Sequence, residues 1–284
     1  MKHCDVIDKI LAYHPNLEHY HGCDEYKAGN PDDTCTGIVS ALVPTVEVIR
    51  KTAALGCNLL ITHEPISYQT PDFPAWRGSY PNRVFEEKEQ LLRETGITVW
   101  RDHDHMHAHR PDSIFTGVIH GLGWDEYYHP AEGLGVFPIT LPEITVGDLG
   151  RYLKEKLSLH GLRYMGNPAD KISKVALVGH LFPNCFMPEG VGDDGYYHDY
   201  AMEIIRLMEE EGVQAIIPGE IIEWTVLAYI RDGIAQGKPM ACYNVGHFNW
   251  EELGMQYAVD WIGDLVDHQV PVHYVPTGDA FSYL

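Results

Sequence analysis

Basic residues are scarce in this sequence. Its 284 residues include 20 Lys and Arg against 41 Asp and Glu, which gives a formal net charge of −21 at pH 7. A surface of that sign repels the phosphate backbone of nucleic acids and the headgroups of anionic membranes, so neither is an expected partner. A small anionic substrate stays compatible with the composition, because a bound divalent cation can reverse the local field.

The sequence also lacks paired cysteines and long apolar runs. The cysteines are scattered without any Cys-x-x-Cys pair: Cys4, Cys23, Cys35, Cys57, Cys185 and Cys242. In a chain of this length they indicate buried thiols in a reducing compartment rather than a disulfide framework. No run approaches the roughly 20 apolar residues that span a bilayer, and the first residues lack the apolar core of a signal peptide. We therefore expect a cytoplasmic protein.

Short apolar segments alternate with amphipathic ones in both halves of the chain. The predicted buried strands lie at 38–43, 59–61, 97–100, 175–178, 215–217 and 240–245, and the predicted helices at 46–53, 84–94, 200–211 and 222–235. This order predicts an α/β protein made of a duplicated unit, with parallel strands joined by helical crossovers. We divide the chain into a first α/β repeat at 1–120, a connecting or inserted segment at 121–172 without chemistry of its own, and a second repeat at 173–284.

Imidazole and carboxylate side chains follow three of the predicted strands. They form three clusters: His63 with Glu64, His103 with His107, and His247 with Glu251. Open α/β sheets carry their functional groups beyond the carboxyl ends of strands, so three such clusters predict one folded site. These residue types bind divalent Zn, Fe, Mn, Ni or Co and show no preference for thiolate ligands. We predict a metal site that holds one or two ions per chain.

The spacing within two of the clusters indicates helix starts. Residues four apart share one face of a helix, whereas on a strand they lie roughly 13 Å apart, too far for one ion. The alternative is a strand over 103–109, in which four histidines alternate on one face as in His-x-His metallohydrolases. A weakly metal-binding, His-rich loop would give the same sequence.

Each candidate also has a purely structural explanation. For His63-Glu64 alone we favour an exposed loop pair, because neighbours in an extended segment point opposite ways. Glu220 follows the strand predicted at 215–217 and could be a general base, a partner to a metal ligand, or an acid at a helix N-terminus, the last being the simplest role. His180 is either part of the same cleft or a structural histidine.

These motifs resemble a known family. The segment LLITHEP at 59–65 is similar to the ITHHP signature of the Nif3-like, dinuclear-metal-centre family, also called the GTP cyclohydrolase 1 type 2/Nif3 family. The segment 97–107 resembles its strand ending in H-x-x-x-D, PGE at 218–220 its TGE or TGD, and GHFNWE at 246–251 its GH-x-x-S-E. The resemblance covers nearly the whole chain.

The resemblance implies a three-layer α/β/α fold with two intertwined βαβαβ repeats and a ring-shaped homohexamer whose metal sites face an internal cavity. Matched position by position, it implies the metal ligands His63, Glu64, His103, His107, His247 and Glu251. Two positions depart from the family pattern, because Glu64 replaces its second His and His107 replaces its Asp. An imidazole bridges two ions poorly, since each nitrogen holds one ion, whereas Glu64 restores a carboxylate.

Two functions are consistent with these residues. The first is a metal-dependent hydrolase in which the ion lowers the pKa of a water molecule and Glu251 or Glu220 handles protons. By family analogy its substrate would be a purine nucleotide whose imidazole ring is opened with loss of formate, as in a GTP cyclohydrolase. The second is a non-catalytic metal-binding scaffold or regulatory oligomer with a saturated coordination shell. We favour the hydrolase, although the sequence shows no glycine-rich phosphate loop.

Overall fold

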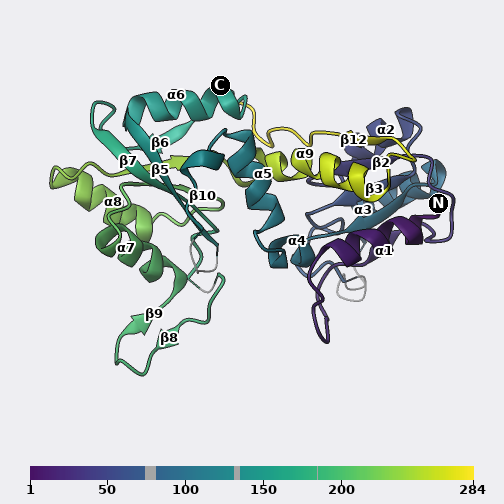
Figure 1. Ribbon diagram of the computed structural model, residues 1–284, viewed down its shortest axis with the longest axis horizontal. Helices are drawn as coiled ribbons and strands as arrows, with labels where there is room; N and C mark the ends of the chain where they lie inside the picture. The colour runs from purple at the N-terminus through teal and green to yellow at the C-terminus, as the bar shows by residue number, and fades with distance from the viewer. Residues whose placement is uncertain (74–80, 131–134, 184) are drawn as a thin grey trace. The chain divides into compact units, whose positions relative to one another are not determined.

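The computed structural model describes residues 1–73, 81–130, 135–183 and 185–284. The chain forms two compact units, Met1–Val118 with Glu251–Gly278, and Ile119–Trp250 with Asp279–Leu284. Over the described residues, each unit is built on one five-stranded mixed sheet with helices packed on its faces (Figure 1). The prediction of an α/β protein is therefore confirmed.

The sheet of the first unit has the strand order β1-β4-β3-β2-β12. Its strands are β1 (Tyr26–Ala28), β2 (Ile38–Ala41), β3 (Leu59–Thr62), β4 (Thr98–Arg101) and β12 (Val272–Tyr274). Only β1 runs antiparallel to its neighbour among the described strands of this sheet. Every residue of β2, β3 and β4 is buried, as is typical of parallel strands covered on both faces.

Helices cover both faces of this first sheet. On one face α2 (Val46–Ala54) and α3 (Arg83–Thr95) share an apolar core with the strands, in which Val39 and Leu60 pack with Ile49 and Phe85. On the other face lies α9 (His247–Leu265), whose Met255 carbonyl accepts a hydrogen bond of 2.7 Å from the Ser40 hydroxyl. The remaining helices that start in this unit are α1 (His3–Tyr13), α4 (Asp104–Ala108) and α5 (Ser113–Gly121).

The sheet of the second unit has the order β5-β7-β10-β11-β6. Its strands are β5 (Val136–Thr145), β6 (Arg163–Met165), β7 (Lys171–Val178), β10 (Ala215–Pro218) and β11 (Ala241–Asn244). The three inner strands are parallel, and β5 and β6 close the two edges in antiparallel register. A short ribbon of β8 (Gly190–Val191) and β9 (Tyr197–His198) and the 3-10 turn η2 (Asp125–Tyr127) complete the unit.

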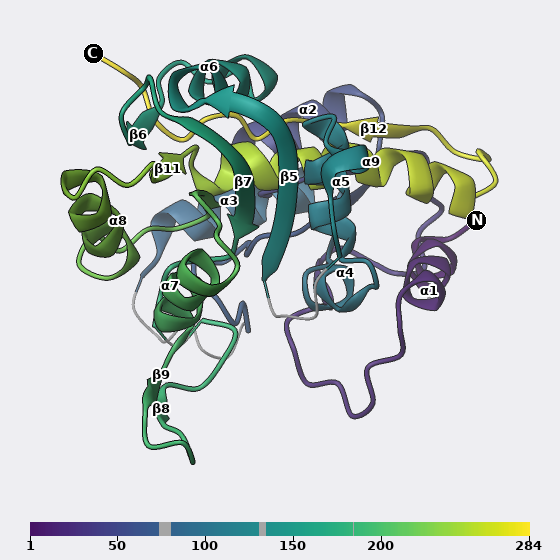
Figure 2. The same ribbon diagram turned by 60° about the vertical axis from the view of Figure 1, so that its left-hand side comes forward.

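Helices also pack on both faces of this second sheet, as Figure 2 shows. On one face α7 (Tyr200–Glu210) and α8 (Val226–Ala235) form an apolar core with inner-strand residues such as Ile216. On the other face α6 (Val146–Lys156) contacts β11, where the Tyr243 hydroxyl donates to the Val146 carbonyl at 2.7 Å. The second unit therefore has the same three layers as the first.

The duplicated order predicted from the sequence is present, as β2-α2-β3-α3-β4 and β7-α7-β10-α8-β11. The units nevertheless divide the chain differently from the predicted segments. Residues 121–172, expected to be a connection, contain β5, α6 and β6, and both edges of the second sheet come from them. Residues 251–278, expected in the second repeat, belong to the first unit, where β12 pairs with β2.

Helix α9 is long, and its buried residues include Met255, Ala258 and Ile262. Its apolar residues are interrupted by acidic ones on the same helix. Among the described helices, this one included, none has both the length and the apolar character required for crossing a lipid bilayer.

Candidate metal centre

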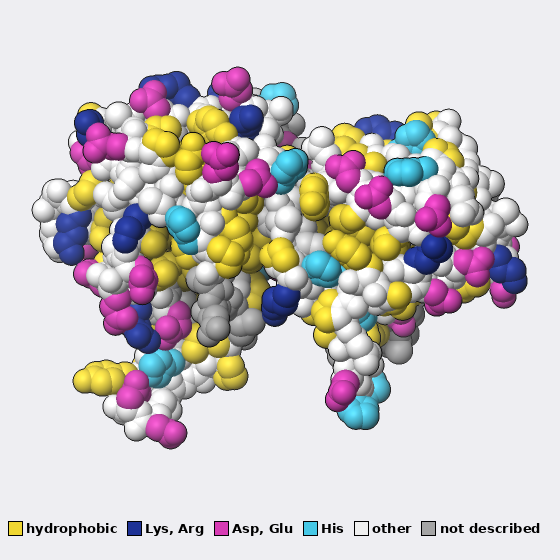
Figure 3. Space-filling model, viewed as in Figure 1, with side chains coloured by type: hydrophobic (Ala, Val, Ile, Leu, Met, Phe, Trp, Pro, Cys, Tyr) yellow, Lys and Arg dark blue, Asp and Glu magenta, His cyan; other side chains and the backbone are white. Residues whose placement is uncertain are grey.

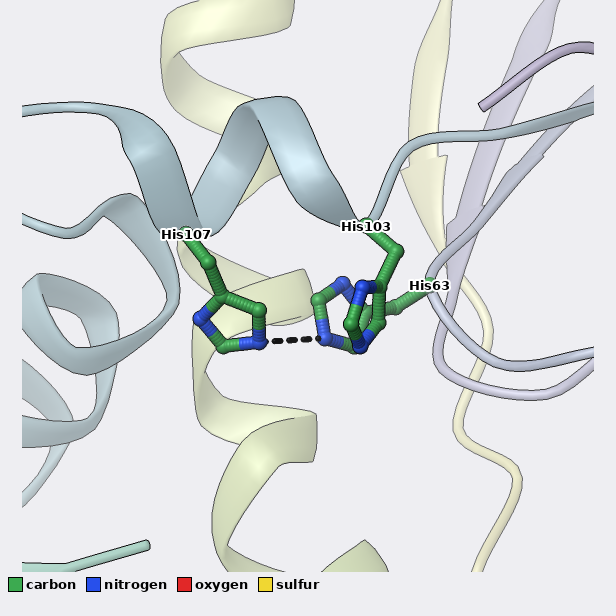
Figure 4. Close-up of side chains that lie close together, drawn as sticks. All are labelled: His63, His103 and His107. Carbon is green, nitrogen blue, oxygen red and sulfur yellow. Dashed lines mark hydrogen bonds between the residues drawn. The ribbon is translucent and has the colours of Figure 1, made fainter. Parts of the chain in front are cut away.

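Three histidine rings meet at the carboxyl ends of β3 and β4 in the first unit (Figure 4). His63 directly follows β3, His103 precedes the first residue of α4, and His107 lies one turn further along that helix. The ring centroids are 4.4 Å apart for His63 and His103, 4.8 Å for His63 and His107, and 4.9 Å for His103 and His107. One ring nitrogen from each lies within 4.8 Å of the other two.

The helix start expected after β4 is what brings His103 and His107 together. The alternative strand over 103–109 is wrong, because residues 104–108 are helical. His105 points elsewhere in the unit, and its Nδ1 donates to the Asp24 carboxylate at 2.7 Å. His109 instead stacks on the Tyr13 ring, with centroids 4.6 Å apart.

Each imidazole of the cluster is held through its Nδ1 atom. The acceptors are the Asp102 backbone carbonyl for His63 at 3.1 Å, the Asp104 carboxylate for His103 at 2.8 Å, and the Asp112 carboxylate for His107 at 2.9 Å. These oxygens only accept, so each ring donates from Nδ1 and retains Nε2 for another partner. Metal-binding histidines almost always donate their second nitrogen in this way.

The Nε2 atoms of His63 and His107 lie 3.1 Å apart. Burial and the neighbouring His103 and His107 rings hold the pKa of His63 well below its usual value. Burial also opposes the charged form of His107, but the Asp112 carboxylate, together with those of Glu251 and Glu64, outweighs it and raises the pKa of His107 to about 9. His107 is therefore the protonated ring and donates to the neutral His63.

That nitrogen separation also suits a metal ion. Two imidazole nitrogens bound to one zinc ion, at about 2.0–2.1 Å each, are separated by roughly 2.9–3.4 Å. The observed 3.1 Å falls within this range. A divalent cation could therefore take the place of the proton that His63 and His107 share.

Two carboxylates adjoin the histidines. The buried Glu251 of α9 places Oε2 at 3.7 Å from Nε2 of His63. Glu64 directly follows His63, and one ligand atom from each of His63, Glu64 and Glu251 lies within 4.8 Å of the other two. His63 is fully buried, so the favoured interpretation of His63-Glu64 as an exposed loop pair is wrong.

His247 and Glu220 lie together in the second unit. Nδ1 of His247, the first residue of α9, is 3.5 Å from Oε1 of Glu220, and its ring centroid is 4.4 Å from that of His180. Nδ1 of His180 accepts from the Glu220 backbone N–H at 3.0 Å. The simplest role expected for Glu220, an acid in the first turn of a helix, does not apply because α8 begins only at Val226.

Two carboxylates that support the histidines, those of Asp24 and Asp112, are not indicated by the motifs of the sequence. Asp24 accepts hydrogen bonds from the backbone N–H groups of His103, at 2.7 Å, and of His105, at 2.9 Å, and so fixes the start of α4. Nothing in the local sequence connects Asp24 with that helix. Asp112 left a weak signal, because an Asp just before a helix is a common N-cap, and its carboxylate accepts from Phe115 N–H at 3.0 Å.

Lys88 anchors the loop that follows Glu64. Its Nζ donates to the Ile66 carbonyl at 2.8 Å and lies 4.5 Å from the centre of the Tyr68 ring. The side chain is buried, which lowers its pKa from 10.5 to about 8. Below pH 8 the folded chain must therefore hold an ammonium group in a poorly solvated position.

We expect the free energy of unfolding of the wild type to rise relative to Lys88→Met as the pH increases from 7 to 10. Between the folded-state pKa of about 8 and the unfolded value of 10.5, the unfolded chain binds the proton that the folded chain has released. Stability must rise with pH in that window, here by roughly 2–3 kcal/mol. Urea unfolding of both proteins at the two pH values measures the difference, and parallel pH profiles would contradict it.

The fold and the cluster define the class of this protein. It is an α/β protein whose candidate metal centre sits at the carboxyl ends of parallel strands. Residues 7–180, more than half of the chain, match the family model of Duf34/NIF3 (NGG1p interacting factor 3). The chain belongs to the Duf34/NIF3 family, as the motifs in the sequence predicted.

Relatives and solved structures agree with this assignment. The chain is 25% identical over 258 residues to a Clostridium perfringens protein named GTP cyclohydrolase 1 type 2 homolog, covering 88% of this chain and 87% of that protein. A Clostridium acetobutylicum protein of the same name is 24% identical over 231 residues, covering 78% and 75%. Staphylococcus aureus protein SA1388 has a similar structure, with a TM-score of 0.71 at 16% identity, and covers 100% of this chain and 99% of its own. A Bacillus cereus protein related to NIF3 gives 0.72 at 14% identity, with the same coverage. These two likenesses show the fold.

Proposed function

We propose that this member of the Duf34/NIF3 family is a metal-dependent hydrolase. The observation that supports the proposal most is the fixing of three imidazoles through Nδ1, which keeps their Nε2 atoms for a common ligand. Such a supporting set of oxygens is typical of protein metal sites.

The ligands that we propose combine nitrogen and oxygen donors. They are His63, Glu64, His103, His107 and Glu251, together with His247, one helical turn before Glu251 in α9. This donor set suits Zn, Fe, Mn, Ni or Co. With Glu64 and Glu251 supplying carboxylates, we propose one or two ions per chain.

When bound, such an ion supplies Lewis acidity that brings the pKa of a water molecule toward neutrality. The chain's own residues then have separate tasks. Glu251, buried against His63, would accept a proton at Oε2, while the more exposed Glu220 would exchange protons through Oε1 beside His247. Arg101, whose Nε donates to the His63 carbonyl at 2.9 Å, keeps the segment that carries His63 and Glu64 in place.

For the substrate we propose a purine nucleotide, opened with loss of formate as in a GTP cyclohydrolase. The names of the two clostridial relatives support this choice. From the same family membership we infer a cytoplasmic homohexamer. Light scattering coupled to size-exclusion chromatography tests the assembly, which should have the mass of six chains.

The function is tested by formate release from GTP. Tag-free protein loaded with Zn, Mn or Fe should release formate faster than metal-free protein, and His247→Ala should lose both bound metal and turnover. His120→Ala is the control, since His120 is an exposed histidine of α5 and is not among the proposed ligands. Metal-loaded wild type that releases no formate from any purine nucleotide would favour the scaffold function, and His247→Ala with full metal and activity would refute the ligand assignment.

A further inference from the structure

A cavity of about 450 Å³ lies within the second unit, beside β6, β11 and α8. Its apolar lining includes Met165, Leu227 and Cys242. Its polar lining includes Arg163, Arg231, Asn244 and one carboxylate, that of Glu223. The volume is in the range that accommodates a small organic ligand. Because all of these residues belong to one unit, the cavity is formed without any residue of the histidine cluster in the first unit.

Strand register explains why these side chains gather there. In the antiparallel pair, Asn244 of β11 stands opposite Arg163 of β6, and Cys242 stands opposite Met165. Residues two apart in a strand face the same side, so all four point away from α6 and toward α8. Tyr243, between them, faces the other side and bonds to α6.

The polar groups of the cavity are suited to an anion. Arg163 pairs with Glu223 at 3.2 Å, and both side chains are more than 70% exposed, so this pair is readily exchanged for another partner. The side chains of Arg231 and Asn244 make no hydrogen bond or ion pair with any residue that the structure describes. A guanidinium group binds carboxylate and phosphate through two parallel N–H donors.

Two arginines in one cavity stand out against the acidic composition of the chain. Lys and Arg number 20 against 41 Asp and Glu, and Figure 3 shows acidic side chains on the visible face of both units. An anion is repelled over most of such a surface. The two guanidinium groups of this cavity outnumber its one carboxylate, that of Glu223, so its lining carries a net positive charge.

We propose that this cavity binds a small organic anion. Its carboxylate or phosphate contacts Arg163 and Arg231, and its apolar body lies against Met165, Leu227 and Cys242. The site binds without covalent reaction, because burial raises the pKa of the Cys242 thiol to about 12 and keeps it protonated. This anion binding goes beyond the proposed hydrolase function, since it requires neither the metal nor the histidine cluster.

The test is calorimetric titration of the metal-free full chain with two anions and their uncharged counterparts. The anions are guanosine monophosphate and 2-naphthoate, and the counterparts are guanosine and 2-naphthylmethanol. We expect at least one anion to bind more tightly than its counterpart. Arg231→Gln and Arg163→Gln should each weaken that binding by about tenfold or more, because each removes a hydrogen bond to a charged group.

Arg151→Gln is the matched control, since Arg151 is an exposed, ion-paired arginine of α6 in the same unit but outside the cavity. Tighter binding of the monophosphate assigns the site to phosphate, and tighter binding of the naphthoate assigns it to carboxylate. No binding of either anion at millimolar concentration would overturn the proposal. Equal affinity of the wild type and both cavity variants for the bound anion would also overturn the proposal. Because metal is absent throughout, failure of the proposed hydrolase leaves this result unaffected.

Discussion

Replacing His63 with alanine is expected to weaken zinc binding by more than 100-fold. His63 is common to the imidazole group with His103 and His107 and to the group with Glu64 and Glu251. Loss of a residue that only supports a metal ligand costs about 10–100-fold in affinity. Removal of the shared ligand itself must cost more. Competition against a zinc chelator of known affinity, with tag-free protein, measures the change.

Two further variants keep this prediction testable if the cavity left by His63→Ala disturbs folding. His103→Ala removes a less buried ring of the same cluster and should also weaken binding strongly. His120→Ala removes an exposed histidine outside it and should bind like the wild type. Wild-type affinity in both His63→Ala and His103→Ala, with intact folding, would mean that zinc binds elsewhere on the chain.

Replacing Asp112 with asparagine is expected to weaken zinc binding by about 10–100-fold. The Asp112 carboxylate accepts from Nδ1 of His107 at 2.9 Å and thereby fixes the ring and increases its basicity. The loss should be greater at pH 9.5 than at pH 7. At pH 7 the wild-type ring, with a pKa of about 9, must first release a proton to bind a cation, and Asp112→Asn reduces that competition.

Asp112 also caps a helix, and Asp199→Asn is the control for this capping role. Both residues cap a helix: Asp112 accepts from Phe115 N–H, and Asp199, before α7, accepts from Met202 N–H at 2.7 Å. Asparagine is as good an N-cap as aspartate, so neither variant should lose much stability. Equal zinc affinity in Asp112→Asn and the wild type at both pH values would show that His107 is not a ligand.

Local sequence signals accounted for most of the fold. The apolar segments at 38–43, 59–61 and 97–100 are buried in β2, β3 and β4, because strands covered on both faces must be apolar throughout. The side chain of Thr45 caps α2, and Gly96 ends α3 with φ +65°. In each case the sequence signal lies within a segment of a few residues.

Local sequence signals could not predict which unit contains residues 251–278, nor that β5 and β6 complete the second sheet. The apolar face of α9 shows that the helix is buried, but its periodicity does not identify the sheet that covers it. The strands β5 and β6 lie at sheet edges, where one face or one side is solvated, so their patterns are weaker than those of inner strands. Their pairing with β7 and β11 is decided by contacts distant in sequence.

The residues of the candidate site likewise fall into those with a local sequence signal and those placed by contacts distant in sequence. His63, His103 and His107 could be selected because each stands directly after a strand or one helical turn later. Asp24 could not, since its bonds to the start of α4 span 79 residues or more of the chain. The sequence likewise did not indicate that Arg163 and Arg231 lie close together, because strand register and the packing of α8 bring them to one cavity.

X-ray absorption spectroscopy at the zinc edge of tag-free protein loaded with zinc tests the metal centre most directly. We expect nitrogen and oxygen ligands at about 2.0–2.2 Å, with the more distant scattering of at least two imidazole rings. His63→Ala should retain too little zinc for a comparable spectrum. A shell containing sulfur at about 2.3 Å, or wild-type protein that takes up no zinc, would contradict the assignment of this histidine cluster as a metal centre.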